Sequence, residues 1–174
     1  MKTFHHFAYG SNMSTARLRA RCPSAMPLAV GFVRGRTLRF HKLGTDGTGK
    51  ANAFATNNEF DILWGVVYET LLSEKHELDR CESLGVGYEH VTVQVHVEDR
   101  TIDTFLYQAI ANRIDNSLLP VDWYHDHVVK GSIEHGLPVD YHAMIASVTP
   151  VRSQQVEALN RRLDSGVNRP SYRG

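Results

Sequence analysis

The chain has 174 residues, of which 42% are hydrophobic and 22% charged, and its 19 Lys and Arg balance 19 Asp and Glu. This composition predicts one domain with a sizeable core, and the zero net charge argues against electrostatic binding of nucleic acid or of anionic membranes. The longest apolar run, Ile62 to Tyr68, is too short to span a bilayer, and neither a secretory signal nor a disulfide framework is apparent, so we expect a cytoplasmic protein.

The first 70 residues predict strands around one short helix. Phe4 to Tyr9 is an apolar-aromatic run typical of a strand, and the Gly10-Ser11-Asn12 turn ends it. We expect Ser14 to cap a short helix from Thr15 to Arg21, because Pro23 follows. Further strands are predicted within residues 26–43, 51–55 and 61–69, with a loop at 44–49.

The periodicity then becomes helical. Ser73 is the expected cap of a helix on which Leu71, Leu78 and Cys81 share one face. Valines at positions 91, 93, 95 and 97 alternate with polar residues, which predicts a half-buried strand, and residues 101–110 form its hairpin partner. Helices are predicted at 121–135, 138–147 and 153–163. Together these elements predict a mixed α+β domain over residues 1–163, followed by a mobile tail at 164–174.

The junction between the first strand and the first helix is a candidate binding site. A strand that ends at Gly10 and is followed by small polar residues points several backbone N–H groups in one direction. Such a turn can receive a carboxylate, a phosphate or a developing oxyanion. Gly-Ser-Asn is also ordinary turn chemistry, so the segment alone leaves both interpretations open.

Glu82 is a candidate catalytic residue because it lies four residues after Leu78, on the face that should point inward. A carboxylate in that position needs a partner or a chemical role, such as that of a general base. The alternative is a glutamate at a helix end that turns out to solvent. Asp79 and Glu77 lie further from the apolar face and are expected to be solvated.

The ten histidines and two cysteines show no spacing typical of a zinc site, so we expect no metal. Residues 44–50 superficially resemble a phosphate-binding loop. They lack its Gly-Lys-Ser/Thr ending, which favours a hairpin tip. The chain also has no Gly-x-Ser-x-Gly motif of a nucleophilic serine.

Four segments, in this order, resemble the γ-glutamylcyclotransferase-like family. They are Phe-Ala-Tyr-Gly-Ser-Asn-Met at 7–13, Leu-Trp-Gly-Val-Val-Tyr at 63–68, Asp-Arg-Cys-Glu-Ser-Leu-Gly at 79–85 with Tyr88, and Gly-Leu-Pro-Val-Asp-Tyr at 136–141. The resemblance extends from Phe4 to Val148. It implies a mixed, mostly antiparallel β-barrel with peripheral helices.

The family releases 5-oxoproline from γ-glutamyl compounds through attack of the substrate's own α-amine on its γ-carbonyl. The resemblance implies that Glu82 is the general base and that no metal or organic cofactor takes part. It also implies that a small γ-glutamyl substrate is bound by Tyr9, Gly10, Ser11, Asn12, Met13, Tyr107 and Tyr124.

Two positions depart from the family pattern. Ser83 follows Glu82 where the family often has glycine. Asn12 follows Ser11 where the glutathione-specific branch usually has leucine, which argues against glutathione as the natural substrate.

Two other functions stay open. An enzyme that removes a γ-glutamyl group from a biosynthetic intermediate would use the same chemistry with a different leaving-group pocket. A non-catalytic binding module on the same fold has no need of Glu82. The oligomeric state is also open, with a homodimer among the options.

Overall fold

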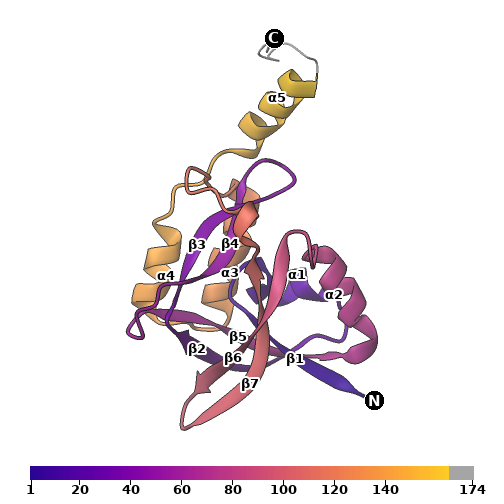
Figure 1. Ribbon diagram of the computed structural model, residues 1–174, viewed down its shortest axis with the longest axis vertical. Coiled ribbons are helices and arrows are strands. Elements are labelled where there is room, and N and C mark those ends of the chain that lie inside the picture. The colour runs from indigo at the N-terminus through magenta and orange to yellow at the C-terminus, as the bar shows by residue number, and fades with distance from the viewer. Residues whose placement is uncertain (165–174) are drawn as a thin grey trace.

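The structure, a computed structural model, describes residues 1–164 and has a mixed α+β fold in which helices surround a curved assembly of strands (Figure 1). The strands are β1 (Thr3–Ala8), β2 (Met26–Arg34), β3 (Arg36–Leu43), β4 (Gly49–Ala55), β5 (Ile62–Leu71), β6 (Tyr88–Val97) and β7 (Arg100–Ala109). The α-helices are α1 (Thr15–Arg19), α2 (Lys75–Cys81), α3 (Asp122–Glu134), α4 (Val139–Ala146) and α5 (Ser153–Asp164). Short 3-10 helices are η1 (Ser11–Met13), η2 (Leu72–Glu74) and η3 (Ala111–Arg113). Apart from Asp164, which ends α5, the predicted mobile tail lies outside the described residues.

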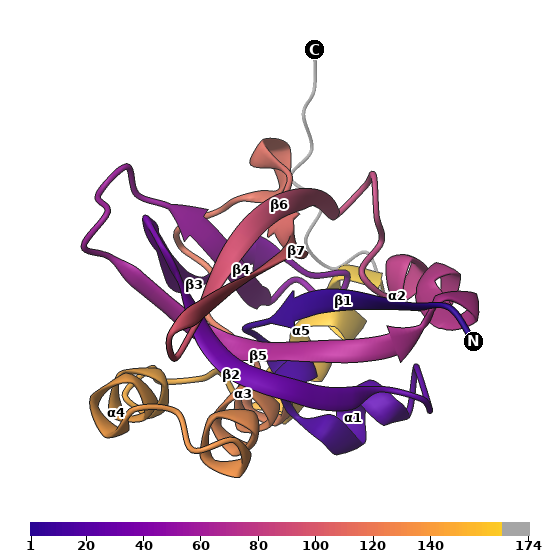
Figure 2. The same ribbon diagram turned by 90° about the horizontal axis from the view of Figure 1, so that it is seen from below.

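The strands form two antiparallel sheets, which confirms the prediction of mostly antiparallel pairing. The larger has the order β1-β5-β2-β6-β7, and the smaller is the β3-β4 hairpin. The predicted closed barrel is not found, because within residues 1–164 the edge strands β1 and β7 share no ladder of hydrogen bonds. The two edges nevertheless lie side by side (Figure 2), and their contacts run through side chains such as the stacked rings of Phe4 and Phe105.

The β6-β7 hairpin confirms the strand predicted from alternating valines. Val93, Val95 and Val97 are buried, whereas Thr92 and Gln94 are exposed. β6 and β7 pair in register from Tyr88 with Ala109 to Val97 with Arg100. This register places Tyr88 and Tyr107 near one end of the hairpin, beside the end of β1.

The helix predicted from Ser73 begins later than expected. β5 continues to Leu71, which pairs with Thr3, and the residue at the N-cap position of α2 is Glu74. Leu71 therefore belongs to a sheet edge, and of the predicted apolar face only Leu78 is buried in α2. The first helix does have Ser14 at its N-cap position, as predicted, although the Ser14 side chain makes no capping hydrogen bond.

Helix α3 packs closely against the turn that follows β1. A Cβ atom on Gly131 would lie 2.5 Å from the Met13 Cβ and 2.7 Å from the Ser14 nitrogen, so only glycine permits this approach. Tyr124 on the same helix hydrogen-bonds to β4. Contacts of α3 therefore hold the turn and β4 in place around one cavity.

Throughout residues 1–164, no helix has both the length and the apolar character needed to cross a membrane.

Candidate active site

A cavity of about 30 Å³ lies at the C-terminal end of β1, where the chain turns into η1. Its walls come from β1, η1, β4, β6, β7, α3 and the end of α2. The lining residues are His6, Phe7, Ala8, Tyr9, Gly10, Ser11, Asn12, Ala51, Glu82, Tyr88, Tyr107 and Tyr124. Segments that are far apart in the sequence therefore meet at this one point.

Most of the site residues predicted from the sequence line this cavity. They are Tyr9, Gly10, Ser11, Asn12, Glu82, Tyr107 and Tyr124. Met13 lies outside the lining: its side chain is fully buried against α3, and its carbonyl accepts a hydrogen bond from the Tyr68 hydroxyl at 2.9 Å. The structure therefore gives Met13 a place in the core beneath the turn.

Gly10 is needed for packing between the turn and β4. Its φ of −113° is accessible to any residue, but an added Cβ would lie 2.7 Å from the Ala51 Cβ and 3.5 Å from the Tyr124 hydroxyl. The close neighbour that excludes a side chain is therefore the methyl group of Ala51. Because Ala51 lies on β4, Gly10 lets the turn and β4 form adjacent walls of the cavity.

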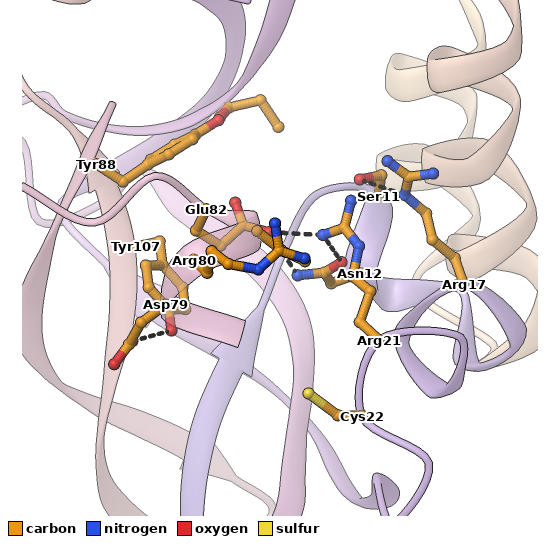
Figure 3. A network of polar contacts seen from close by, with 12 residues as sticks. Ser11, Asn12, Arg17, Arg21, Cys22, Asp79, Arg80, Glu82, Tyr88 and Tyr107 are labelled. Atoms are coloured by element: carbon orange, nitrogen blue, oxygen red, sulfur yellow. Dashed lines mark hydrogen bonds and ion pairs between the residues drawn. The ribbon is translucent and has the colours of Figure 1, made fainter. Parts of the chain in front are cut away.

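Glu82 lies at the C-cap of α2 and points inward, with 16% of its side chain exposed. Its Oε1 accepts hydrogen bonds from Arg21 Nη1 at 2.9 Å and from Asn12 Nδ2 at 3.0 Å (Figure 3). Arg21 Nη1 also donates to Asn12 Oδ1 at 3.0 Å, which closes a triangle of three side chains. The inward orientation expected from helical periodicity is correct, and Arg21 is the partner that sequence analysis missed.

The cavity tyrosines are fixed through their hydroxyl groups. Tyr9 donates to the carbonyl of Tyr107, and Tyr88 donates to the carbonyl of Ala51 at 2.7 Å. Tyr124 accepts from the Ala51 nitrogen at 3.0 Å. Burial raises the pKa of Tyr9 and the pKa of Tyr88 well above the ordinary value. These tyrosines therefore stay neutral and provide rigid polar walls.

Asp79 differs from the prediction of a solvated charge. It accepts hydrogen bonds from the Tyr107 hydroxyl at 2.6 Å, Lys75 at 2.8 Å and His90 at 3.0 Å. Burial alone would raise the pKa of Asp79, but the hydrogen bonds from Lys75 and Tyr107 lower it overall. Asp79 is therefore an ionised acceptor that orients the Tyr107 ring in the cavity wall. Glu77, by contrast, is on the surface and pairs with Arg80, as expected for a solvated charge.

A second cavity of about 200 Å³ adjoins the first. The two share Ser11, Glu82, Tyr88 and Tyr124. The second is distinguished by its cations, which are Arg17, Arg21, Lys42 and Lys50. We call it the basic groove; no motif found in the sequence connects its four cations.

Among residues 1–164, no group of three or more His, Cys, Asp or Glu residues is arranged to hold a metal ion. His125, one of the histidines with close neighbours in sequence, is buried and its Nε2 lies 2.9 Å from the Ile145 carbonyl. That contact gives His125 a role in packing α3 against α4.

Comparison with known proteins supports the same relationship as the four motifs. Residues 62–145 match the AIG2-like family. The chain is 29% identical to a γ-glutamylcyclotransferase of Bos taurus and 28% identical to that of Homo sapiens. Each alignment spans 152 residues and covers 86% of this chain and 80% of the relative. A solved γ-glutamyl cyclotransferase structure aligns with a TM-score of 0.78 and 25% identity, over 92% of this chain and 99% of the other.

The sequence matches cover 86% of the chain and the structural match covers 92% of it. These matches support the relationship to the γ-glutamylcyclotransferase-like family that the four motifs indicate, and they support an enzyme of the γ-glutamylcyclotransferase type.

Proposed function

We propose that this enzyme releases 5-oxoproline from small γ-glutamyl amines or γ-glutamyl amino acids, with Glu82 as the group that transfers the proton. One observation carries the proposal: a carboxylate held by Arg21 and Asn12 lines a cavity walled by neutral tyrosines, beside the turn between β1 and η1. A carboxylate with both a fixed orientation and access to a ligand is suited to general acid–base chemistry.

The reaction is an intramolecular transfer. The α-amine nitrogen of the substrate attacks the γ-carbonyl carbon, a new C–N bond closes the five-membered ring, and the old amide C–N bond breaks. Glu82 takes one proton from the attacking nitrogen and returns a proton to the leaving nitrogen, so no water is consumed. Because both reacting groups belong to one molecule, the enzyme does not need to bring two reactants together. It only has to hold the substrate in the conformation in which its α-amine folds back onto its γ-carbonyl.

The Gly10-Ser11-Asn12 turn is the proposed site for an anionic oxygen of the γ-glutamyl half. The first hydrogen bond of this turn runs from the Met13 nitrogen to the Gly10 carbonyl, which leaves the preceding N–H groups outside the helical pattern. These donors suit the α-carboxylate or the oxyanion that forms at the γ-carbonyl. One well-placed donor to an oxyanion lowers the activation barrier by on the order of 3 kcal/mol.

An enzyme that deprotects a γ-glutamyl intermediate would carry out the same step on a different leaving amine. The two functions therefore share Glu82 and the turn, and they differ in what the basic groove accepts.

The test is to incubate the protein with a panel of γ-glutamyl dipeptides and γ-glutamyl amines and to quantify 5-oxoproline, glutamate and free amine. We expect equimolar 5-oxoproline and amine without glutamate. A matched panel with an acetylated α-amine should be inert, because its nitrogen cannot attack. Release of glutamate, or no product from the entire panel, would contradict the proposal.

A further inference from the structure

Lys42 is a buried cation that points into the basic groove. The residue is only 8% exposed, and its Nζ lies over the ring of Tyr88, 4.8 Å from the centroid. Within residues 1–164 its ammonium group has neither a hydrogen bond nor an ion pair. Burial lowers the pKa of Lys42, and the charges of Glu82 and Asp46 offset only part of that effect.

The other cations of the groove differ in whether they already have an anionic partner. Arg21 is paired with Glu82, and Lys50 is paired with Asp46 at 2.7 Å. Arg17 donates to the Ser11 hydroxyl at 3.1 Å, and its guanidinium lies over Trp123 at 5.5 Å from the ring centroid. In the described part of the chain, neither Arg17 nor Lys42 therefore forms a direct ion pair with a carboxylate.

The position of the groove relative to Glu82 indicates which part of a substrate it receives. Glu82 lines both cavities, and in the proposed reaction its carboxylate protonates the leaving nitrogen. The first cavity, of about 30 Å³, is smaller than the adjoining groove of about 200 Å³. With the γ-glutamyl half against the turn of the first cavity, the leaving amine extends from Glu82 into the larger groove.

We propose that the basic groove is the leaving-group subsite and that it favours an amine with two negative charges, held by Lys42 and Arg17. The inference rests on the proposed function and names its substrate class. The shared chemistry is a dianionic amine, which can be an acidic amino acid or a phosphorylated amine. A buried cation without a partner is costly, and a charge-matched leaving group removes that cost when it binds.

The first test varies the charge of the leaving group on wild-type enzyme. The series is γ-glutamyl-alaninamide, γ-glutamyl-alanine, γ-glutamyl-aspartate and γ-glutamyl-phosphoethanolamine, with γ-glutamyl-asparagine as a monoanion matched in size to aspartate. We expect kcat/KM for 5-oxoproline release to rise about 10-fold for each added charge, the scale of a charge-assisted hydrogen bond. A higher rate for the aspartate or the phosphate conjugate distinguishes the two sources.

The second test asks whether Lys42 senses that charge. Lys42→Met keeps most of the length of the side chain and should lower the aspartate-to-asparagine selectivity ratio about 10-fold, whereas Lys42→Arg should retain the ratio. Lys130, exposed on α3 outside the groove, is the matched control, and Lys130→Met should leave the ratio unchanged. The substrate series needs no variant, so it decides the matter even if Lys42→Met fails to fold.

Each outcome separates the two proposals. If every substrate yields 5-oxoproline at the same rate, the cyclotransferase function stands and the leaving-group inference is wrong. The inference is also wrong if Lys42→Met lowers kcat/KM equally for all substrates, because Lys42 would then bind the γ-glutamyl half. If no substrate yields 5-oxoproline, the proposed function itself is wrong and the inference with it.

Discussion

Arg21 and Glu82 are 61 positions apart in the chain, yet Arg21 Nη1 lies 2.9 Å from Glu82 Oε1. The same nitrogen donates to Asn12, which in turn donates to Glu82, so the turn after β1 and the end of α2 are joined by one guanidinium. Arg21 therefore holds the carboxylate and the substrate-binding turn at a fixed separation.

Removal of Arg21 should affect turnover more than binding. In Arg21→Met, Glu82 keeps only Asn12 as a hydrogen-bond donor, and the carboxylate loses its fixed orientation. We expect kcat to fall about 10-fold or more, the effect of one charged hydrogen bond, with a smaller change in KM. Steady-state kinetics of 5-oxoproline release measure both constants. A raised KM at unchanged kcat would mean that Arg21 binds substrate and does not orient Glu82.

Gly10→Ala should destabilise the protein through contact with β4. The added Cβ meets the Ala51 methyl at 2.7 Å, and overpacking of this kind costs about 1–3 kcal/mol of unfolding free energy. Ala51→Gly removes that methyl. The unfolding free energy of the double variant should therefore be close to that of Ala51→Gly alone, because Gly10→Ala no longer meets a close neighbour there. Urea unfolding of the two single variants and the double variant measures the coupling. Strictly additive effects would rule out this contact as the reason for Gly10.

The sequence allowed prediction of those features that depend on local patterns. Alternating valines located β6, and helical spacing from Leu78 gave the inward orientation of Glu82. The prediction that Asp79 is solvated is wrong. Helical periodicity identifies the apolar face of the helix but does not reveal that Tyr107 of β7 contacts the side that carries Asp79.

Arg21 and Lys42 could not be found in the same way. Arg21 contacts Glu82, and Lys42 lies over the ring of Tyr88. In each case the two residues are distant in sequence and meet only through tertiary packing. The predicted barrel failed for a related reason: strand spacing predicts antiparallel pairing but does not determine whether the edges β1 and β7 join.

Ser83 occupies a backbone conformation that suits glycine. Its φ is +52°, in the left-handed region that costs a residue with a Cβ on the order of 1 kcal/mol. This conformation explains why glycine is compatible with the position after Glu82. Ser83→Gly should therefore raise the unfolding free energy by about 0.5–1 kcal/mol, whereas Ser83→Ala, which keeps the Cβ, should give no such gain. Chemical denaturation of both variants is the measurement, and equal stabilities would contradict the explanation.

His6 should make the protein less stable in acid. Its ring is buried, and within the described residues neither ring nitrogen has a hydrogen-bond partner. Burial, together with the charges of Lys75 and His5, lowers the pKa of His6 from 6.5 to about 3. Between these values the unfolded chain binds a proton that the folded protein does not, so stability falls as pH decreases from 6.5 towards 3.

His6→Phe should remove this contribution. The slope of unfolding free energy against pH below 6.5 should decrease by up to about 1.4 kcal/mol per pH unit. Urea unfolding at pH 7, 6 and 5 gives the slope of unfolding free energy against pH for both proteins. The larger phenylalanine ring can change the unfolding free energy by a constant amount, but it does not change this slope. An identical slope in both proteins would show that His6 does not cause the acid sensitivity.

The kcat of Glu82→Gln tests most directly whether Glu82 transfers the proton. Glutamine preserves size and can still accept from Arg21, so the fold should survive while it can no longer take a proton. Glu77→Gln, on the exposed face of the same helix, is the matched control for loss of a carboxylate. With a γ-glutamyl dipeptide that the wild type converts, we predict a fall in kcat of ~10² or more for Glu82→Gln and a near wild-type rate for Glu77→Gln. A folded Glu82→Gln that releases 5-oxoproline at close to the wild-type rate would show that Glu82 does not transfer the proton.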